Sequence, residues 1–352
     1  MLVSQEKSTT PLHPTEQRDD IMKSLDQKLA RIRAGNYTPA DFIIADAKDP
    51  DMAFGIACPG PARDASGRLL GGLATRPAFL QTMRDMTKSG LVDIMLTSVS
   101  TAQILQSERL FDNSPVTPAV RYNDTTDIWY QRGATYGQEP SQPFRTARLG
   151  KLNGIADLGL YSMTFSNNVD GDLRTLNAYS QFREEASALG LRHFLEVFNP
   201  AFDVGISSAK IGTYIGDSIV RALAGVVAEE QPVFLKIVYN GRRATEELAQ
   251  YDPSRLVVGV LGGGKGTTRD TFELLHRAEV AGARVALFGR KINFAERPLT
   301  LVSLMRRVVA RELTPEDAVI AYHDDLAAND CPPTLALMDD MKITEPTLLA
   351  DD

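Results

Sequence analysis

Residues 255–264, with the sequence RLVVGVLGGG, are a run of mainly aliphatic residues that ends in three glycines. The run predicts a buried strand, and the polar residues from Thr267 onward predict the start of a helix. In an open doubly wound sheet the glycine-rich fingerprint follows the first strand. Here the first strand that we expect, 52–60, leads into CPGPARD, and the glycine cluster follows the seventh strand. This placement favours a closed barrel over an open sheet.

The rest of the chain alternates between strand and helix patterns. Strands are predicted at 52–60, 92–99, 116–124, 155–166, 192–200, 233–241, 255–264 and 283–292. Segments with helical spacing of apolar residues follow most of them, the last one at 299–313. Strands that alternate with helices imply parallel pairing, and eight such units in about 260 residues predict an α/β fold of the (β/α)8 TIM-barrel type.

The two ends of the chain differ from this pattern. Residues 20–35 have helical spacing and end on Gly35, which predicts an extra N-terminal helix. We therefore expect an arm and helix over 1–40, a catalytic barrel over 41–335 and a C-terminal tail over 336–352. The longest connection, 125–150, follows the third predicted strand, on the face where barrel chemistry occurs, and is typical of a lid or a subunit contact.

Composition limits the classes of partner. The 352 residues carry a net charge of −7, which gives no support for binding to nucleic acid or to an anionic membrane. The two cysteines, Cys58 and Cys331, form no zinc-binding pattern. The sequence shows neither a signal-peptide core nor an apolar stretch of membrane-spanning length. We expect a cytoplasmic protein that needs no metal or other cofactor.

A single lysine interrupts the apolar stretch VFLKIVYNG at 233–241. If Lys236 faces the barrel interior, it shares that face with Phe234 and Val238. Loss of hydration disfavours the ammonium form, and a neutral amine attacks carbonyl groups to give a protonated Schiff base, which is an electron sink. Two structural alternatives remain open: the side chain extends outward to water, or it forms a buried ion pair with Glu196 or with an aspartate of the second strand.

Basic residues flank the glycines. Lys265 follows Gly262, Gly263 and Gly264 directly, and the eighth strand ends at Gly289 and Arg290. Glycines allow a close approach of backbone N–H groups to an anion, and barrels often bind phosphate between the loops after strands seven and eight. The sequence therefore predicts a phosphate site here, although three glycines also suit a tight turn.

Three other polar residues lie in apolar strands. Glu196 is a candidate general base, or a partner of Lys236 on the neighbouring strand. Arg121 is a candidate anchor for a second anionic group, or a counter-charge for Glu196. Tyr161 is a candidate proton donor, or a packing residue. Asp93 opens the second strand, at the bottom of the barrel, where we expect a structural role.

These features occur together and in order: FLEVF in strand five, FLKIVY in strand six, GGGK after strand seven and GRKI after strand eight. Their combination resembles the class I aldolases of the DhnA and tagatose-bisphosphate aldolase group, over about residues 50–310. The resemblance implies a Schiff base on Lys236, a phosphorylated sugar as substrate and a homo-oligomer. It also implies that Gly263, Gly264, Gly289 and Arg290 hold the phosphate and that Glu196 is the strand-five acid.

One position departs from that family. The family places an acidic residue at the end of strand one, where the expected strand here reads Ala57-Cys58-Pro59-Gly60. Asp64 lies a few residues later, and Asp46 and Asp49 lie upstream. Either another residue serves as acid and base, with Glu196 or Tyr161 as candidates, or the aldol step itself has changed.

The leading hypothesis is a lyase that breaks or forms a C–C bond in a phosphorylated ketose through an imine on Lys236. A second hypothesis is a phosphosugar isomerase or epimerase that uses Glu196 as base without an imine. A third is an aldolase-like barrel that has lost catalysis and serves in binding or assembly; the absent acid of strand one is its main argument.

Overall fold

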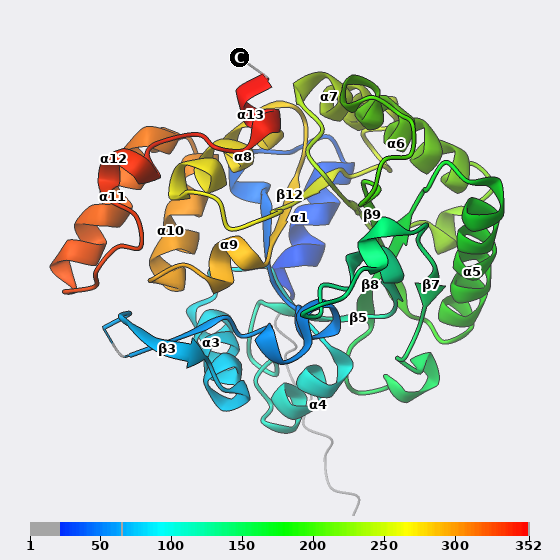
Figure 1. Cartoon of the computed structure of the whole chain (residues 1–352). Helices are drawn as coiled ribbons and strands as arrows, with labels where there is room; N and C mark the ends of the chain where they lie inside the picture. The colour runs from blue at the N-terminus through cyan, green and yellow to red at the C-terminus, as the bar shows by residue number, and fades with distance from the viewer. Residues whose placement is uncertain (1–21, 65, 351–352) are drawn as a thin grey trace, which may run out of the picture.

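The computed structural model describes residues 22–64 and 66–350 and contains a closed barrel of eight parallel strands. In the order in which they neighbour one another around the barrel, the strands are β1 (Ile43–Lys48), β4 (Ile94–Thr97), β5 (Thr117–Arg121), β8 (Leu158–Thr164), β9 (Arg192–Phe198), β10 (Leu235–Ile237), β11 (Gly259–Leu261) and β12 (Val285–Phe288), which pairs with β1. Helices surround this barrel (Figure 1). The fold is the predicted TIM barrel.

The helices follow the strands as a TIM barrel requires. They are α3 (Arg76–Ser89), α4 (Val99–Ser107), α5 (Val169–Ala188), α6 (Ser208–Leu223), α7 (Arg242–Tyr251), α8 (Thr268–Val280), α9 (Arg290–Asn293) and α10 (Pro298–Val309), then α11 (Pro315–Ala328), α12 (Leu337–Asp340) and α13 (Pro346–Ala350). Short 3-10 turns lie at Pro39–Asp41, Gly55–Ala57, Thr126–Ile128, Tyr136–Gln138, Leu149–Lys151 and Ala228–Glu230.

The first strand lies upstream of the stretch that we expected. Strand β1 is Ile43–Lys48, and every one of its residues is buried. The expected strand 52–60 instead forms the short helix α2 (Asp51–Phe54) and a 3-10 turn. Pro50 and Asp51 favour a helix start, and Gly55, with φ of +56°, ends it. The prediction for strand one was therefore wrong.

An N-terminal helix, α1 (Ser24–Arg33), precedes β1, as predicted. Its buried face, Leu25, Leu29 and Ile32, belongs to the same apolar cluster as the interior residues Phe194 and Phe234. Helix α1 thus closes the barrel at the amino ends of the strands. The arm that we expected before it lies, up to residue 21, outside the described residues.

The C-terminal residues 336–350, which we expected to form a tail, fold back onto the barrel. Asp340 Oδ1 accepts a hydrogen bond from the backbone N–H of Thr268, at the start of α8, over 2.7 Å. Glu345 forms an ion pair with Lys291, with 2.6 Å between Oε1 and Nζ. Figure 1 shows α13 at the carboxyl-terminal end of the chain, close to α8.

Two insertions follow strands at the carboxyl ends of the barrel. One follows β1 and contains the antiparallel pair β2 (Pro61–Arg63) and β3 (Leu69–Leu73); the other follows β5 and contains the pair β6 (Asp124–Thr125) and β7 (Pro143–Phe144). They meet where the rings of Phe54 and Tyr130 stack at 5.3 Å between centroids. The backbone N–H of Tyr130 also donates to the carbonyl of Ala53 over 3.0 Å.

Among the described residues, no helix has both the length and the apolar character needed to cross a bilayer.

Candidate active site

Lys236 lies on the inner face of the barrel. It stands on β10 directly beside Glu196 of β9, and its Nζ is 2.6 Å from Glu196 Oε1. Both side chains are almost fully buried. Of the readings open from the sequence, the structure shows the inward lysine paired with Glu196. This pairing places a proton acceptor in direct contact with the amine.

Arg121, at the end of β5, connects Glu196 to further polar groups. Its Nη2 is 3.3 Å from Glu196 Oε2, and its Nη1 donates to Ser162 Oγ over 2.9 Å. The Ser162 hydroxyl in turn donates to Glu196 Oε2 over 2.7 Å. The guanidinium is buried and engaged within the protein, which fits the predicted role as a counter-charge for Glu196 better than that of an anchor for a substrate anion.

Asp49 supplies the acidic residue that seemed to be missing from strand one. It directly follows the true β1, and its Oδ2 is 2.6 Å from Arg121 Nε. Burial alone would raise the pKa of Asp49, but the charges of Arg121 and Lys236 hold this pKa below its ordinary value. The missing acidic residue was thus a consequence of the misplaced strand, although Pro50 and Asp51 stand where the family has His or Gln and then Gly. It no longer argues for a barrel without catalysis.

A second buried lysine, Lys48, lies on β1, on the face that points away from the barrel interior. Asp46 and Lys48 alternate with the interior residues Ala45 and Ala47, so they point away from the barrel interior. Lys48 Nζ is 3.6 Å from Asp46 Oδ2 and donates to Asn293 Oδ1 over 2.9 Å. Burial raises the pKa of Asp46 to about 6 and lowers the pKa of Lys48. This pair is separate from the interior network.

Asp124 is a member of the interior network that sequence reasoning missed. It is fully buried in β6, and its Oδ1 lies 3.4 Å from Arg121 Nη1. Its Oδ2 has no hydrogen-bond partner in the described part of the chain. Burial raises the pKa of Asp124 to about 6. A buried carboxyl with one free oxygen and a pKa near neutrality is suited to proton transfer.

Tyr161, a predicted proton donor, lies on the outer face of β8. Its ring is 4.3 Å from that of Phe182 and 5.1 Å from that of Tyr179, both on α5, measured between centroids. Burial raises the pKa of the Tyr161 hydroxyl. The side chain packs between strand and helix, so the structure does not bring it together with Lys236.

The glycines after β11 form an open loop. Gly263 has φ of +65°, and nothing lies within 4 Å of a Cβ placed at Gly263 or Gly264, whereas Gly262 packs against Phe288. Lys265 Nζ is 3.6 Å from Glu296 Oε1. The first N–H of α8 donates to Asp340, so this helix end is already occupied within the protein.

Arg290 is the first residue of α9 and follows Gly289, directly after the neighbouring strand β12. Burial lowers the pKa of Arg290, and its guanidinium lies 5.5 Å from the ring centroid of Phe54. No carboxylate among residues 22–64 and 66–350 comes within ion-pair distance of it. Glu345 acts on Arg290 only from beyond ion-pair distance, and a largely buried cation without a direct ion pair is expected to attract an anion.

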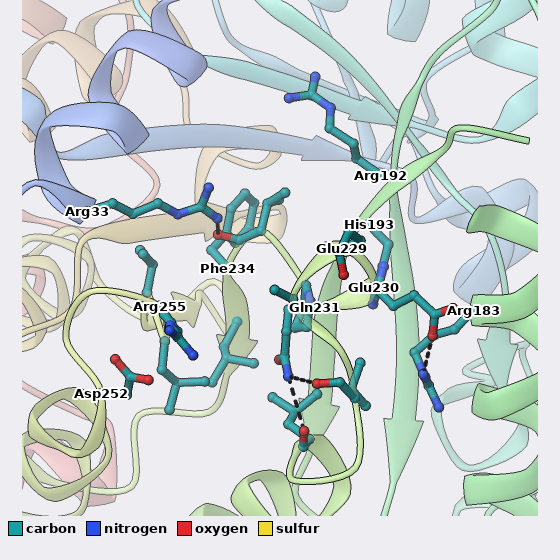
Figure 2. A pocket seen from close by; sticks show the side chains of 18 of the residues that line it. Arg33, Arg183, Arg192, His193, Glu229, Glu230, Gln231, Phe234, Asp252 and Arg255 are labelled. Carbon is teal, nitrogen blue, oxygen red and sulfur yellow. Dashed lines mark hydrogen bonds and ion pairs between the residues drawn. The ribbon is translucent and has the colours of Figure 1, made fainter. Parts of the chain in front are cut away.

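A cavity of about 560 Å³ lies at the other end of the barrel (Figure 2). Its wall includes the starts of β9 and β10, with Arg192 and Phe234, and the guanidinium of Arg255 (Figure 2). Lys236 is not among its lining residues. The cavity is therefore separate from the network around the lysine.

Comparisons with solved structures agree with this architecture. An archaeal fructose 1,6-bisphosphate aldolase superposes with a TM-score of 0.58 at 15% identity, over 82% of this chain and 99% of the other. A fructose-bisphosphate aldolase from Slackia heliotrinireducens gives 0.59 at 13% identity, over 89% and 95%. A Schiff-base-forming fructose-1,6-bisphosphate aldolase gives 0.56 at 17% identity, over 81% and 99%. No family model and no curated protein matches the chain. The likeness establishes an aldolase-like TIM-barrel fold.

Proposed function

We propose that this protein is a class I aldolase that cleaves or forms a C–C bond in a phosphorylated ketose through a Schiff base on Lys236. The observation that carries the proposal is the contact of 2.6 Å between Lys236 Nζ and Glu196 Oε1 inside the barrel. The glycine loop after β11, on the strand next to Lys236, and Arg290 after β12 supply the expected phosphate site. The fold shared with aldolases supports the same reaction class.

Imine formation uses the ion pair as its proton store. Transfer of a proton from the Lys236 ammonium to Glu196 leaves a neutral amine, which adds to the carbonyl carbon of the ketose. After addition, one proton moves from the nitrogen to the former carbonyl oxygen and Glu196 returns the other, so this oxygen leaves as water when the C=N⁺ bond forms. Arg121 and Ser162 hold Glu196 in place through its other oxygen. Burial keeps bulk water away from the iminium.

Cleavage needs a second proton acceptor. We assign this role to Asp124, whose Oδ2 is free and whose pKa of about 6 allows it to accept a proton at neutral pH. Asp124 takes the proton of the hydroxyl on the carbon beyond the scissile bond. That C–C bond then breaks to release an aldehyde, and its electrons move to the nitrogen to give an enamine. Protonation of the enamine carbon and hydrolysis release the second product.

Hydrogen exchange in dihydroxyacetone phosphate tests this proposal without knowledge of the aldehyde partner. An imine acidifies the adjacent C–H bond, so the wild-type protein in D2O should replace that hydrogen with deuterium, detected by proton NMR. Lys236→Met should abolish the exchange, whereas Lys210→Met, on the exposed surface of α6, should retain it. Exchange that survives Lys236→Met would instead indicate enediol chemistry of the isomerase type.

A further inference from the structure

Charge is divided unevenly between the two sides of the barrel mouth. Strand β5, which carries Arg121, stands opposite β11 in the ring of eight strands. The glycine loop therefore faces Arg121 and the three buried acids that contact it, whereas Arg290 follows β12, whose neighbour β1 leads into Asp49. We call Asp49, Asp124 and Glu196 the acid cluster. Lys236, on β10, lies next to β11 on one side and to β9, which carries Glu196, on the other.

The acid cluster carries more negative charge than its cations neutralise. Three carboxylates share two cations, Arg121 and Lys236, so one negative charge remains when all are ionised. The Nε, Nη1 and Nη2 atoms of Arg121 are each within 3.4 Å of one of these carboxylates, which leaves none of its nitrogens without a protein partner. This side of the mouth therefore offers acceptors for hydroxyl groups and no unpaired cation for an anion.

The opposite side holds a cation without a direct ion pair, although the charge of Glu345, which is paired with Lys291, also acts on it. Arg290 has no carboxylate within ion-pair distance among the described residues, and the space above Gly263 and Gly264 is open. Lys265 lies near Glu296 at 3.6 Å, which neutralises part of its charge. This side can accommodate one phosphate group.

We infer that the substrate carries one phosphate, at the end held by Arg290 and the glycine loop, and an uncharged polyhydroxyl end against the acid cluster. The inference rests on the proposed function and names its substrate class. A second phosphate would meet the excess negative charge of the acid cluster. For unit charges about 6 Å apart at an effective dielectric constant near 20, this repulsion corresponds to about a hundredfold in affinity. Hydroxyl groups, in contrast, carry no charge and meet no such repulsion.

Two hexitol phosphates test the inference by calorimetry on the wild-type protein. Mannitol 1-phosphate and mannitol 1,6-bisphosphate have no carbonyl group, so their binding does not depend on an imine. Mannitol has equivalent ends, so the result does not depend on which end enters first. The monophosphate should bind at least about tenfold more tightly at pH 7.5. Equal or tighter binding of the bisphosphate overturns the inference.

A pair of variants tests the cause. Asp124→Asn removes one negative charge from the acid cluster and should improve binding of the bisphosphate several-fold relative to the monophosphate. Asp170→Asn, an exposed change in the first turn of α5, should leave the ratio within about twofold of wild type. A ratio that is the same in both variants would overturn the charge argument.

The result of this binding test can be distinguished from the result of the test of the proposed function. Preference for the monophosphate without imine chemistry at Lys236 would refute the lyase and leave the charge argument intact. Imine chemistry with preference for the bisphosphate would do the reverse.

Discussion

The barrel holds a buried ionic cluster at each end, and the two differ in completeness. At the amino ends of the strands, Asp93 of the loop before β4 accepts hydrogen bonds from Lys28 Nζ at 3.0 Å and Arg306 Nη2 at 2.7 Å. The backbone N–H of Ile44 donates to the same carboxylate over 2.9 Å. At the carboxyl ends, Glu196 binds Lys236 and Arg121.

The bottom cluster is closed. Lys28 and Arg306 also donate to the carbonyl of Phe42, so the cluster ties α1, the barrel and α10 to one another. The upper cluster leaves Asp124 Oδ2 without a partner, and Arg290, at the same end of the barrel, has no direct ion pair among the described residues. A closed cluster stabilises the fold, whereas an incomplete one has capacity for a ligand. We therefore expect changes at the bottom to cost stability and changes at the top to cost activity.

The largest effect is expected for Lys236→Met. Because the amine is the proposed nucleophile, kcat/KM for ketose phosphate cleavage should fall at least about 10⁴-fold. Lys210→Met should leave it unchanged, and circular dichroism should confirm that both variants fold. Activity within tenfold of wild type in Lys236→Met would refute the upper cluster as the place of chemistry.

At the bottom, Asp93→Asn should destabilise the protein by about 3 kcal/mol in urea unfolding. The change leaves two partly buried cations without their shared counter-charge. KM should stay within twofold of the wild-type value, because no residue of the upper network is touched. A stability loss below about 1 kcal/mol would show that the bottom cluster does not hold the fold.

Asp124→Asn should change how stability depends on pH. In the wild type the pKa of Asp124 is about 6 in the folded protein against an ordinary 3.8, so the folded state binds the extra proton and stability from this group falls as pH rises from about 4 to 6. Relative to the wild type, the variant should gain up to about 3 kcal/mol in unfolding free energy between pH 4 and pH 7. A constant difference between the two proteins across this range would contradict the raised pKa of Asp124.

The smallest effect is expected in a comparison of two arginines at opposite ends of the barrel, Arg290 and Arg255. Arg290→Gln should raise KM about 10- to 100-fold with little change in kcat, because it removes a charged contact to the substrate phosphate. Arg255→Gln, in the cavity at the bottom of the barrel, should leave KM unchanged. Equal effects of the two changes would show that Arg290 does not bind phosphate.

Most of the barrel could be predicted from the sequence, because continuous apolar runs of strand length appear at each strand except the first. Strand β1 escaped detection because Asp46 and Lys48 interrupt its apolar pattern, although both are buried. The more apolar stretch at 52–60 looked like a better strand. Barrel closure, which pairs β1 with β4 and β12, determines that residues 43–48 form the first strand, and that closure is a property of the whole chain.

The central pair of the site could also be predicted from the sequence, since Lys236 and Glu196 occupy matching positions on neighbouring strands. Asp124 could not be predicted in this way, because its role depends on contact with Arg121 and on the absence of a partner for one oxygen. The predicted role of Tyr161 as a proton donor was not supported for a simpler reason. Side chains alternate across a strand, so an error of one residue in the register exchanges the interior face for the helix-facing one.

Reductive trapping tests the central claim most directly. The protein is incubated with dihydroxyacetone phosphate and sodium borohydride, and the modified lysine is located by peptide mass spectrometry. We predict one covalent adduct, on Lys236, with inorganic phosphate slowing its formation. An adduct on another buried lysine such as Lys48 or Lys291, or no adduct while C–C cleavage proceeds, would contradict the account.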